Sequence, residues 1–231
     1  MEALWEGLVE ALRLIVHGDR TLRDVALRTL AVSGVSTLIA AAVGVPIGYA
    51  LSRGRFRGRT VALGLLNTGM GLPPVVVGLV VWLMLVRSGP FGGFELVYTK
   101  RGMIIAQVII ATPLVIGFSA AAFQSLPSEL GDLLASLGAR RFRTLWLLAK
   151  EARLGLFVAV MAGFGGAISE VGASMVVGGN LQGTTRVLTP AIVTETSRGK
   201  NDTAIAYGIV LLAIAFAVNL ALTTMQQRSA R

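Results

Sequence analysis

The side chains that could do chemistry are few in this sequence and lie far apart. Among 231 residues there is no cysteine and one histidine, His17, so neither a thiol nucleophile nor a cluster of imidazole metal ligands can be built. The Gly-rich stretch 178–188 lacks the Gly-Lys-Ser/Thr ending of a phosphate-binding loop. A membrane-embedded enzyme is therefore a poor interpretation, and we expect no catalytic residue, no metal site and no cofactor in the chain.

The composition is typical of an integral membrane protein. Of all residues, 54% are hydrophobic and 14% are charged, and the mean hydropathy is +0.74. The formal net charge is +9, but the cations lie at the ends of apolar runs and do not alternate with aromatic residues as in a nucleic-acid groove. We therefore expect contact with a lipid membrane and no nucleic acid as a partner.

Five apolar runs are long enough to cross a membrane as helices. Each has about 22–25 residues, or roughly 33–37 Å at 1.5 Å per residue, against a hydrocarbon core of ~30 Å. The sequence therefore predicts an all-α membrane protein with one transmembrane domain over residues 1–231, in which residues 1–28 form an amphipathic N-terminal segment with an interfacial helix. The expected spans are 29–51, 62–86, 103–125, 154–177 and 203–225.

The distribution of cations predicts the orientation of the spans. Four arginines lie in the short stretch 53–59, and five cations lie in 128–153. In a model with five spans both segments share one side with the C-terminal tail, and a cation-rich short loop is typical of the cytoplasmic side. We therefore expect a multi-pass protein of the cell membrane with its N-terminus outside and its C-terminus in the cytoplasm.

The segment 128–153 predicts two short amphipathic helices. Ser128 is a favourable N-cap, and Glu129 and Asp132 lie in the first turn, where the helix dipole favours acids. Gly138 is expected to end the first helix, and the second is expected over 142–151. Leucines 130, 133, 134 and 137 recur at helical spacing and predict one apolar face. Such a hairpin either lies on the bilayer or docks on a soluble partner.

Two of the expected spans contain features that suggest a pathway. Pro73 and Pro74 remove backbone donors inside the second span, and such a break is tolerated at membrane depth when it is buried in protein or lines a cavity. Glu170 is the one charge in the small-residue run 161–179 of the fourth span, between Ser169 and Gly172. These five residues are candidates for a gate or pathway, and the alternative is that they only stabilise helix packing.

The segment between the fourth and fifth spans is expected on the outer side. It is turn-rich, and a short helix is expected over 190–197. Its position suggests a surface for an external binding protein, and the candidate docking residues are Asn180, Thr185, Arg186, Glu195 and Arg198.

Residues 132–139 resemble the coupling loop of ABC importer permeases, whose short helix docks into a cleft of the ATPase subunit. Asp132 stands where the family usually has Glu, and Leu133 and Leu134 replace its two alanines, whereas Gly138 is as expected. The resemblance implies ATPase coupling for these residues: Glu129, Asp132, Leu133, Leu134, Ala135, Leu137, Gly138 and Ala139.

Segments along nearly the whole chain resemble the permease subunit of tungstate-type ABC importers, within the molybdate, tungstate and sulfate superfamily. These segments are 67–78, 168–173, 177–180, 185–189 and 195–199. The resemblance implies a type I importer fold, a homodimer, two cytoplasmic ATPase subunits that bind ATP and Mg²⁺, and an external oxyanion-binding protein. Tungstate is the expected ion, with molybdate or sulfate as alternatives. A stand-alone secondary transporter is the rival class, but it would need ion ligands near the midplane, where this chain offers Glu170 alone.

Overall fold

The computed structural model describes all residues except 1–4, 6, 10–11, 14–18, 55 and 231, and side chains up to residue 228. Its elements are α2 (Arg20–Arg53), α3 (Arg59–Met70), α4 (Pro74–Leu85), the 3₁₀ turn η1 (Gly92–Phe94), α5 (Lys100–Gln124), α6 (Glu129–Ser136), α7 (Arg141–Glu151), α8 (Arg153–Ile168), α9 (Gly172–Gly178), α10 (Leu188–Ser197) and α11 (Asn201–Ala230). The prediction of an interfacial helix in residues 2–18, including His17, falls mostly outside the described residues.

The prediction of an all-α membrane protein with about five spans is confirmed. Three helices, α2, α5 and α11, are long and apolar enough to cross a membrane. Two helix pairs are long and apolar enough when each pair is taken together, and α3 and α4 meet at 100° whereas α8 and α9 meet at 58°. Counting each bent pair as one span gives five. The first helix begins earlier than the expected residue 29, because Asp19 caps it by accepting the N–H of Leu22 at 2.7 Å.

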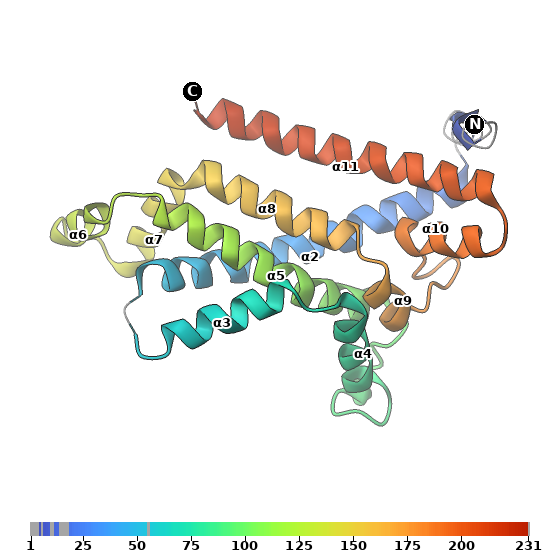
Figure 1. Cartoon of the computed structure of the whole chain (residues 1–231), viewed down its shortest axis with the longest axis horizontal. Helices are drawn as coiled ribbons and strands as arrows, with labels where there is room; N and C mark the ends of the chain where they lie inside the picture. The colour runs from blue at the N-terminus through green and yellow to red at the C-terminus, as the bar shows by residue number, and fades with distance from the viewer. Residues whose placement is uncertain (1–4, 6, 10–11, 14–18, 55, 231) are drawn as a thin grey trace.

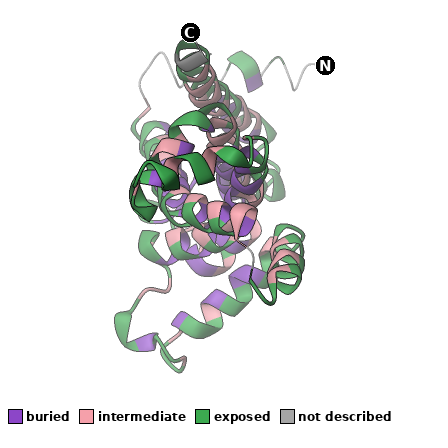
Figure 2. Cartoon of the chain, turned by 90° about the vertical axis from the view of Figure 1, so that its left-hand side faces the viewer, coloured by how far each residue is buried: buried purple, intermediate pink, exposed green. Residues whose placement is uncertain are grey.

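The spans form a bundle whose two ends are different. Helices α2, α5 and α8 pack together, and α11 runs along α8 (Figure 1). The α6–α7 hairpin lies at one end of the bundle, α9 and α10 lie at the other, and α4 turns away from the bundle axis (Figure 1). Buried residues gather between the helices and exposed ones on their outer faces (Figure 2).

Small residues allow helices α2 and α5 to pack closely against each other. Ala40, Gly44 and Gly48 recur every four residues, a small-residue spacing that by itself predicts close helix approach, and all three are buried. A methyl group added at Gly48 would lie 2.8 Å from Ser119 Cβ and 2.9 Å from the carbonyl oxygen of Ile116. The two backbones can therefore approach only because no side chain stands at these positions.

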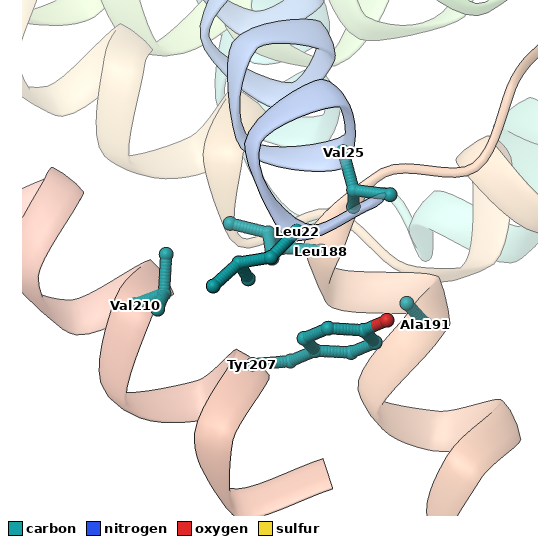
Figure 3. Close-up of a cluster of buried hydrophobic side chains, with 6 residues drawn as sticks. All are labelled: Leu22, Val25, Leu188, Ala191, Tyr207 and Val210. Atoms are coloured by element: carbon teal, nitrogen blue, oxygen red, sulfur yellow. The ribbon is translucent and has the colours of Figure 1, made fainter. Parts of the chain in front are cut away.

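A second cluster joins the first spanning helix to the last one at the α10 end. Leu22 and Val25 from α2, Leu188 and Ala191 from α10, and Tyr207 and Val210 from α11 are buried against one another (Figure 3). The burial of these six apolar side chains against one another fixes α10 between the two long helices.

Candidate functional site

The two broken spans meet each other at the end of the bundle where α9 lies. The α3–α4 break spans Gly71 to Pro73, next to the proline pair, and the α8–α9 break spans Ser169 to Val171. Helix α4 packs directly on α9, and a methyl group added at Gly78 would lie 2.5 Å from the Cα of Ala173. Gly172 packs equally closely on Val75. The helices that follow the two breaks, α4 and α9, are therefore packed against each other, and each fixes the direction that the other takes after its break.

Glu170 lies at the break between α8 and α9. Its side chain is buried, with the residue 6% exposed, and its Oε1 accepts the backbone N–H of Ala173 at 2.7 Å. The sequence suggested one continuous fourth span, whereas the structure has two helices bent by 58°. The carboxylate satisfies a backbone donor that this break frees, so Glu170 stabilises the bend directly.

A cavity of about 210 Å³ lies between the two breaks. Pro74, Ser169 and Glu170 line it, with Met70 and Leu114 among their apolar neighbours. Of the candidate gate residues, Pro73 and Gly172 do not line this cavity: Pro73 is exposed and caps α4, and Gly172 packs on Val75. The structure thus brings three of the five candidates to one small, mostly apolar space.

The loop between α9 and α10 is held together by a charged network. Arg186 and Arg198 both donate to Glu195 Oε1, at 3.3 Å and 3.1 Å. Thr185 donates its hydroxyl to the carbonyl oxygen of Gly178. Thr185, Arg186 and Glu195 are buried in the chain, so these candidate docking residues hold the loop in shape.

The two remaining candidates, Asn180 in this loop and Arg198 at the end of α10, are partly accessible. Asn180 donates to the hydroxyl of Thr194 at 2.7 Å and is partly buried, whereas Arg198 is largely exposed. Direct contact with a binding protein remains a prediction for the surface of this loop, and Arg198 is the candidate whose charge reaches solvent.

Arg28 anchors the same loop to α2, and sequence reasoning missed it. Its guanidinium donates to the carbonyl oxygens of Arg186 at 2.8 Å and Gly183 at 2.9 Å. The neighbouring Thr29 accepts the N–H of Leu188 at 2.9 Å. The sequence did contain a signal for this contact, because Arg28 directly precedes the expected first span. An arginine that is buried at such a position needs hydrogen-bond acceptors such as backbone carbonyls.

The predicted hairpin of two short helices is present at the opposite end. Gly138 has φ +76°, and its N–H donates to Ala135 while that of Ala139 donates to Leu134. These bonds close the α6 C-terminus in the left-handed turn that glycine tolerates. Ser128 does not cap α6 as expected: its hydroxyl donates to the carboxylate of Glu129 at 2.8 Å. A backbone hydrogen bond and then this hydroxyl lower the pKa of Glu129.

The leucines of α6 divide between two faces, which corrects the prediction of one apolar face. Leu130 and Leu134 pack on a buried cluster that includes Phe123 and Leu148. Leu133 and Leu137 are 56% and 75% exposed. One pair thus fixes the helix to the bundle, and the other leaves apolar surface at the tip of the molecule, as a docking element requires.

Arg53 connects the hairpin to α2, which the sequence did not indicate. Its Nη2 donates to the carbonyl oxygens of Leu126 at 2.9 Å and of Phe123 and Pro127 at 3.1 Å. The carbonyl of Phe123 lies in the last turn of α5, and those of Leu126 and Pro127 lie between α5 and α6. One side chain therefore fixes the point where the spanning helix passes into the hairpin.

Comparison with known proteins identifies the class to which this arrangement belongs. Residues 44–231 match the family described as binding-protein-dependent transport system inner membrane component, so the chain belongs to this family. The chain is therefore a multi-pass membrane component of a binding-protein-dependent transport system.

The relatives point to a narrower group. The chain is 39% identical over 227 residues to the tungstate uptake system permease protein TupB of Peptoclostridium acidaminophilum, covering 98% of this chain and 100% of that one. It is 43% identical over 196 residues to a probable anion ABC transporter permease protein of Haloferax volcanii, covering 83% and 84%. These matches confirm the resemblance to tungstate-type ABC importer permeases.

A solved structure supports the fold. A chain of the MetNI methionine ABC transporter matches with a TM-score of 0.74 at 18% identity, covering 91% of this chain and 97% of that one. The type I importer permease fold expected from the sequence is thus confirmed. Among the described residues, no group of three or more His, Cys, Asp or Glu side chains could hold a metal ion.

Proposed function

We propose that this chain is the permease subunit of an ATP-driven importer of tungstate. The identity of the ion is supported by the match to the tungstate uptake permease over nearly the full length of both chains. Molybdate is the second candidate, because the molybdenum permease ModB of Escherichia coli is 27% identical over 188 residues. Both ions are tetrahedral oxyanions of the same charge.

Two copies of the chain would form the pathway between them, and two ATPase subunits would bind ATP and Mg²⁺ on the cytoplasmic side. The α6–α7 hairpin would be cytoplasmic, with the C-terminus on the same side and the N-terminus outside. The short, arginine-rich segment 53–59 supports this orientation because it lies at the hairpin end of the bundle. An oxyanion-binding protein would dock at the outer end, over the loop held by Arg28 and Glu195.

During transport, the contacts between α6 and the bundle and between the two broken spans would transmit movement from the ATPase to the pathway. ATP-driven closure of the ATPase pair would move the exposed leucines of α6, and Leu130 and Leu134 would pass this motion to the bundle. The two broken spans would then separate or close around the cavity that Glu170 lines. Because Glu170 is committed to the N–H of Ala173, it would shape this gate, and its negative charge disfavours a role as a ligand for an anion.

The test is oxyanion-dependent ATP hydrolysis in proteoliposomes that contain the chain with its ATPase and binding protein. We expect strong stimulation by tungstate-loaded binding protein, weaker stimulation with molybdate and none with sulfate. Stimulation by molybdate or sulfate above tungstate would reassign the ion and retain the class. Failure of the chain to co-purify with an ATPase would reject the coupling role and favour a stand-alone transporter.

A further inference from the structure

A wide groove opens at the hairpin end of the bundle, beside the coupling helix. It has a volume of about 1090 Å³ and lies between the end of α2, the start of α3 and the α6–α7 hairpin. Arg53, Arg57, Arg59 and Arg141 line it, and Asp132 is the one acid among its lining residues. The groove is therefore strongly cationic, which favours an anionic occupant.

The four arginines are not equivalent, because two of them are already used inside the chain. Arg53 donates to carbonyl oxygens that follow α5, and Arg59 Nε donates to the carbonyl oxygen of Leu51 at 2.9 Å. Arg57 and Arg141 are exposed and make no hydrogen bond or ion pair with the rest of the described chain. Their guanidinium groups are free to bind a phosphate through paired N–H donors.

The rest of the lining indicates what kind of anion fits. Phe56, which is exposed, and Tyr49, which is partly buried, add apolar surface to the same groove. Tyr49 lies on α2 within four residues of its end, so this apolar surface continues from a membrane-spanning helix. A free phosphate has no apolar part that could contact this surface. A phospholipid has both a charged headgroup and acyl chains, so it can contact the arginines and the apolar surface together.

The groove is bordered by a face of α6 that differs from the face packed on the bundle and from the face with the exposed leucines. Gly131, Asp132 and Ala135 line it, at the spacing of one helix face. Leu130 and Leu134 face the bundle, and Leu133 and Leu137 are exposed. A ligand in the groove would therefore contact the coupling helix without covering its exposed leucine pair.

We propose that this groove binds an anionic phospholipid of the adjoining leaflet, with the headgroup phosphate held by Arg57 and Arg141. The lipid would lie against α6 and would make the position of the coupling helix dependent on the anionic lipid content of the membrane. The proposal does not rest on the identity of the transported ion, and lipid binding can be measured without ATP or a binding protein.

The experiment is a native mass-spectrometry titration of the purified complex of the chain with its ATPase. Short-chain phosphatidylglycerol and phosphatidylcholine are the probes, and the proteins are wild type, Arg57→Ala/Arg141→Ala and the matched control Arg143→Ala. Arg143 lies on the same hairpin, is exposed and does not line the groove. We expect wild type to prefer phosphatidylglycerol, the double variant to bind it about tenfold or more weakly, and the control to match wild type.

Four results would overturn the proposal. Equal binding of the two lipids, or unchanged affinity in the double variant, would remove the arginines as a headgroup site. Displacement of phosphatidylglycerol by an equal concentration of inorganic phosphate would assign the groove to a free anion. Loss of the ATPase from the double variant with unchanged lipid binding would assign it to the protein partner. Arg57→Lys/Arg141→Lys keeps the charge, and its expected intermediate affinity separates lipid loss from misfolding.

Discussion

The carboxylate of Glu170 accepts the backbone N–H of Ala173 at 2.7 Å, across the break between α8 and α9. The acid most suggestive of transport chemistry therefore has a structural partner within its own span. This contact lies beside the second break, at Gly71 to Pro73, and both border one cavity. A change at either break is expected to alter the other.

Glu170→Ala should destabilise the protein, because it leaves the buried N–H of Ala173 without an acceptor. The expected loss is about 1–3 kcal/mol of unfolding free energy, and Glu170→Gln, which retains a carbonyl acceptor, should lose less. The measurement is the thermal unfolding midpoint in detergent. Ser169→Ala is the control, since that hydroxyl is exposed and bonds to the Gly165 carbonyl of its own helix. Equal midpoints for Glu170→Ala and Ser169→Ala would contradict the capping role.

The two leucine pairs of α6 should respond differently to a polar substitution. Leu134→Ser should lower the unfolding midpoint because this partly buried side chain packs on the cluster of Phe123 and Leu148, at a cost of about 1–2 kcal/mol. Leu137→Ser should leave the midpoint unchanged and weaken co-purification of the ATPase. A Leu137→Ser variant that retains the ATPase fully would argue against docking through this exposed surface.

Gly138→Val should uncouple ATP hydrolysis from tungstate uptake in proteoliposomes. A β-branched residue is strained at φ +76°, by about 1–3 kcal/mol, and the turn that sets the angle between α6 and α7 should shift. Gly131→Ala is the matched control, because Gly131 lies inside α6 with no atom near its missing side chain. Coupled uptake at the wild-type rate in Gly138→Val would count against the hairpin as the transmission element.

Arg28→Ala should loosen the loop between α9 and α10, because it removes charged donors from the carbonyls of Gly183 and Arg186. The expected destabilisation is about 1.5–3 kcal/mol, together with weaker stimulation by the binding protein. Arg23→Ala, on the same helix and exposed beside Asp24, should change stability by no more than about 0.5 kcal/mol. Hydrogen exchange of residues 181–188 reports the loop directly, and equal protection in both variants would refute the anchor.

Gly48→Ala should separate α2 from α5, since the new methyl group would collide with the backbone around Ile116 and Ala120. Overpacking of this kind costs about 1–3 kcal/mol. Gly34→Ala on the same helix meets no atom within 4 Å and should instead stabilise the helix by about 0.5–1 kcal/mol. Thermal unfolding of the two variants should therefore shift in opposite directions.

Features set by local chemistry were predictable from the sequence. The hairpin followed from Gly138 and the helical repeat around it, and the break in the second span followed from Pro73 and Pro74. The small-residue repeat at Gly44 and Gly48 marked the contact with α5. Each of these signals lies within a few residues of the structure that it specifies.

Features set by distant partners could not be predicted. The break at Ser169 to Val171 has no proline, and it is stabilised by Glu170 and by α4. The bonds of Arg28 reach residues more than 150 positions away. The division of the α6 leucines depends on where the bundle lies. Residues three and four positions apart form a broad apolar face on a helix, and the bundle covers only part of that face here.

The break in the second span also has a consequence for how the chain is made. Helices α3 and α4 have 12 residues each, or about 18 Å, so neither crosses a bilayer of ~30 Å alone. The surface of α4 around Gly78 is covered by Ala173, roughly ninety residues later. At about 5–20 residues per second, a ribosome needs roughly 5–20 s to supply that cover. During this interval the surface of α4 around Gly78 lacks the cover that it has in the folded chain, so the packing of the second span is completed only after translation of the fourth.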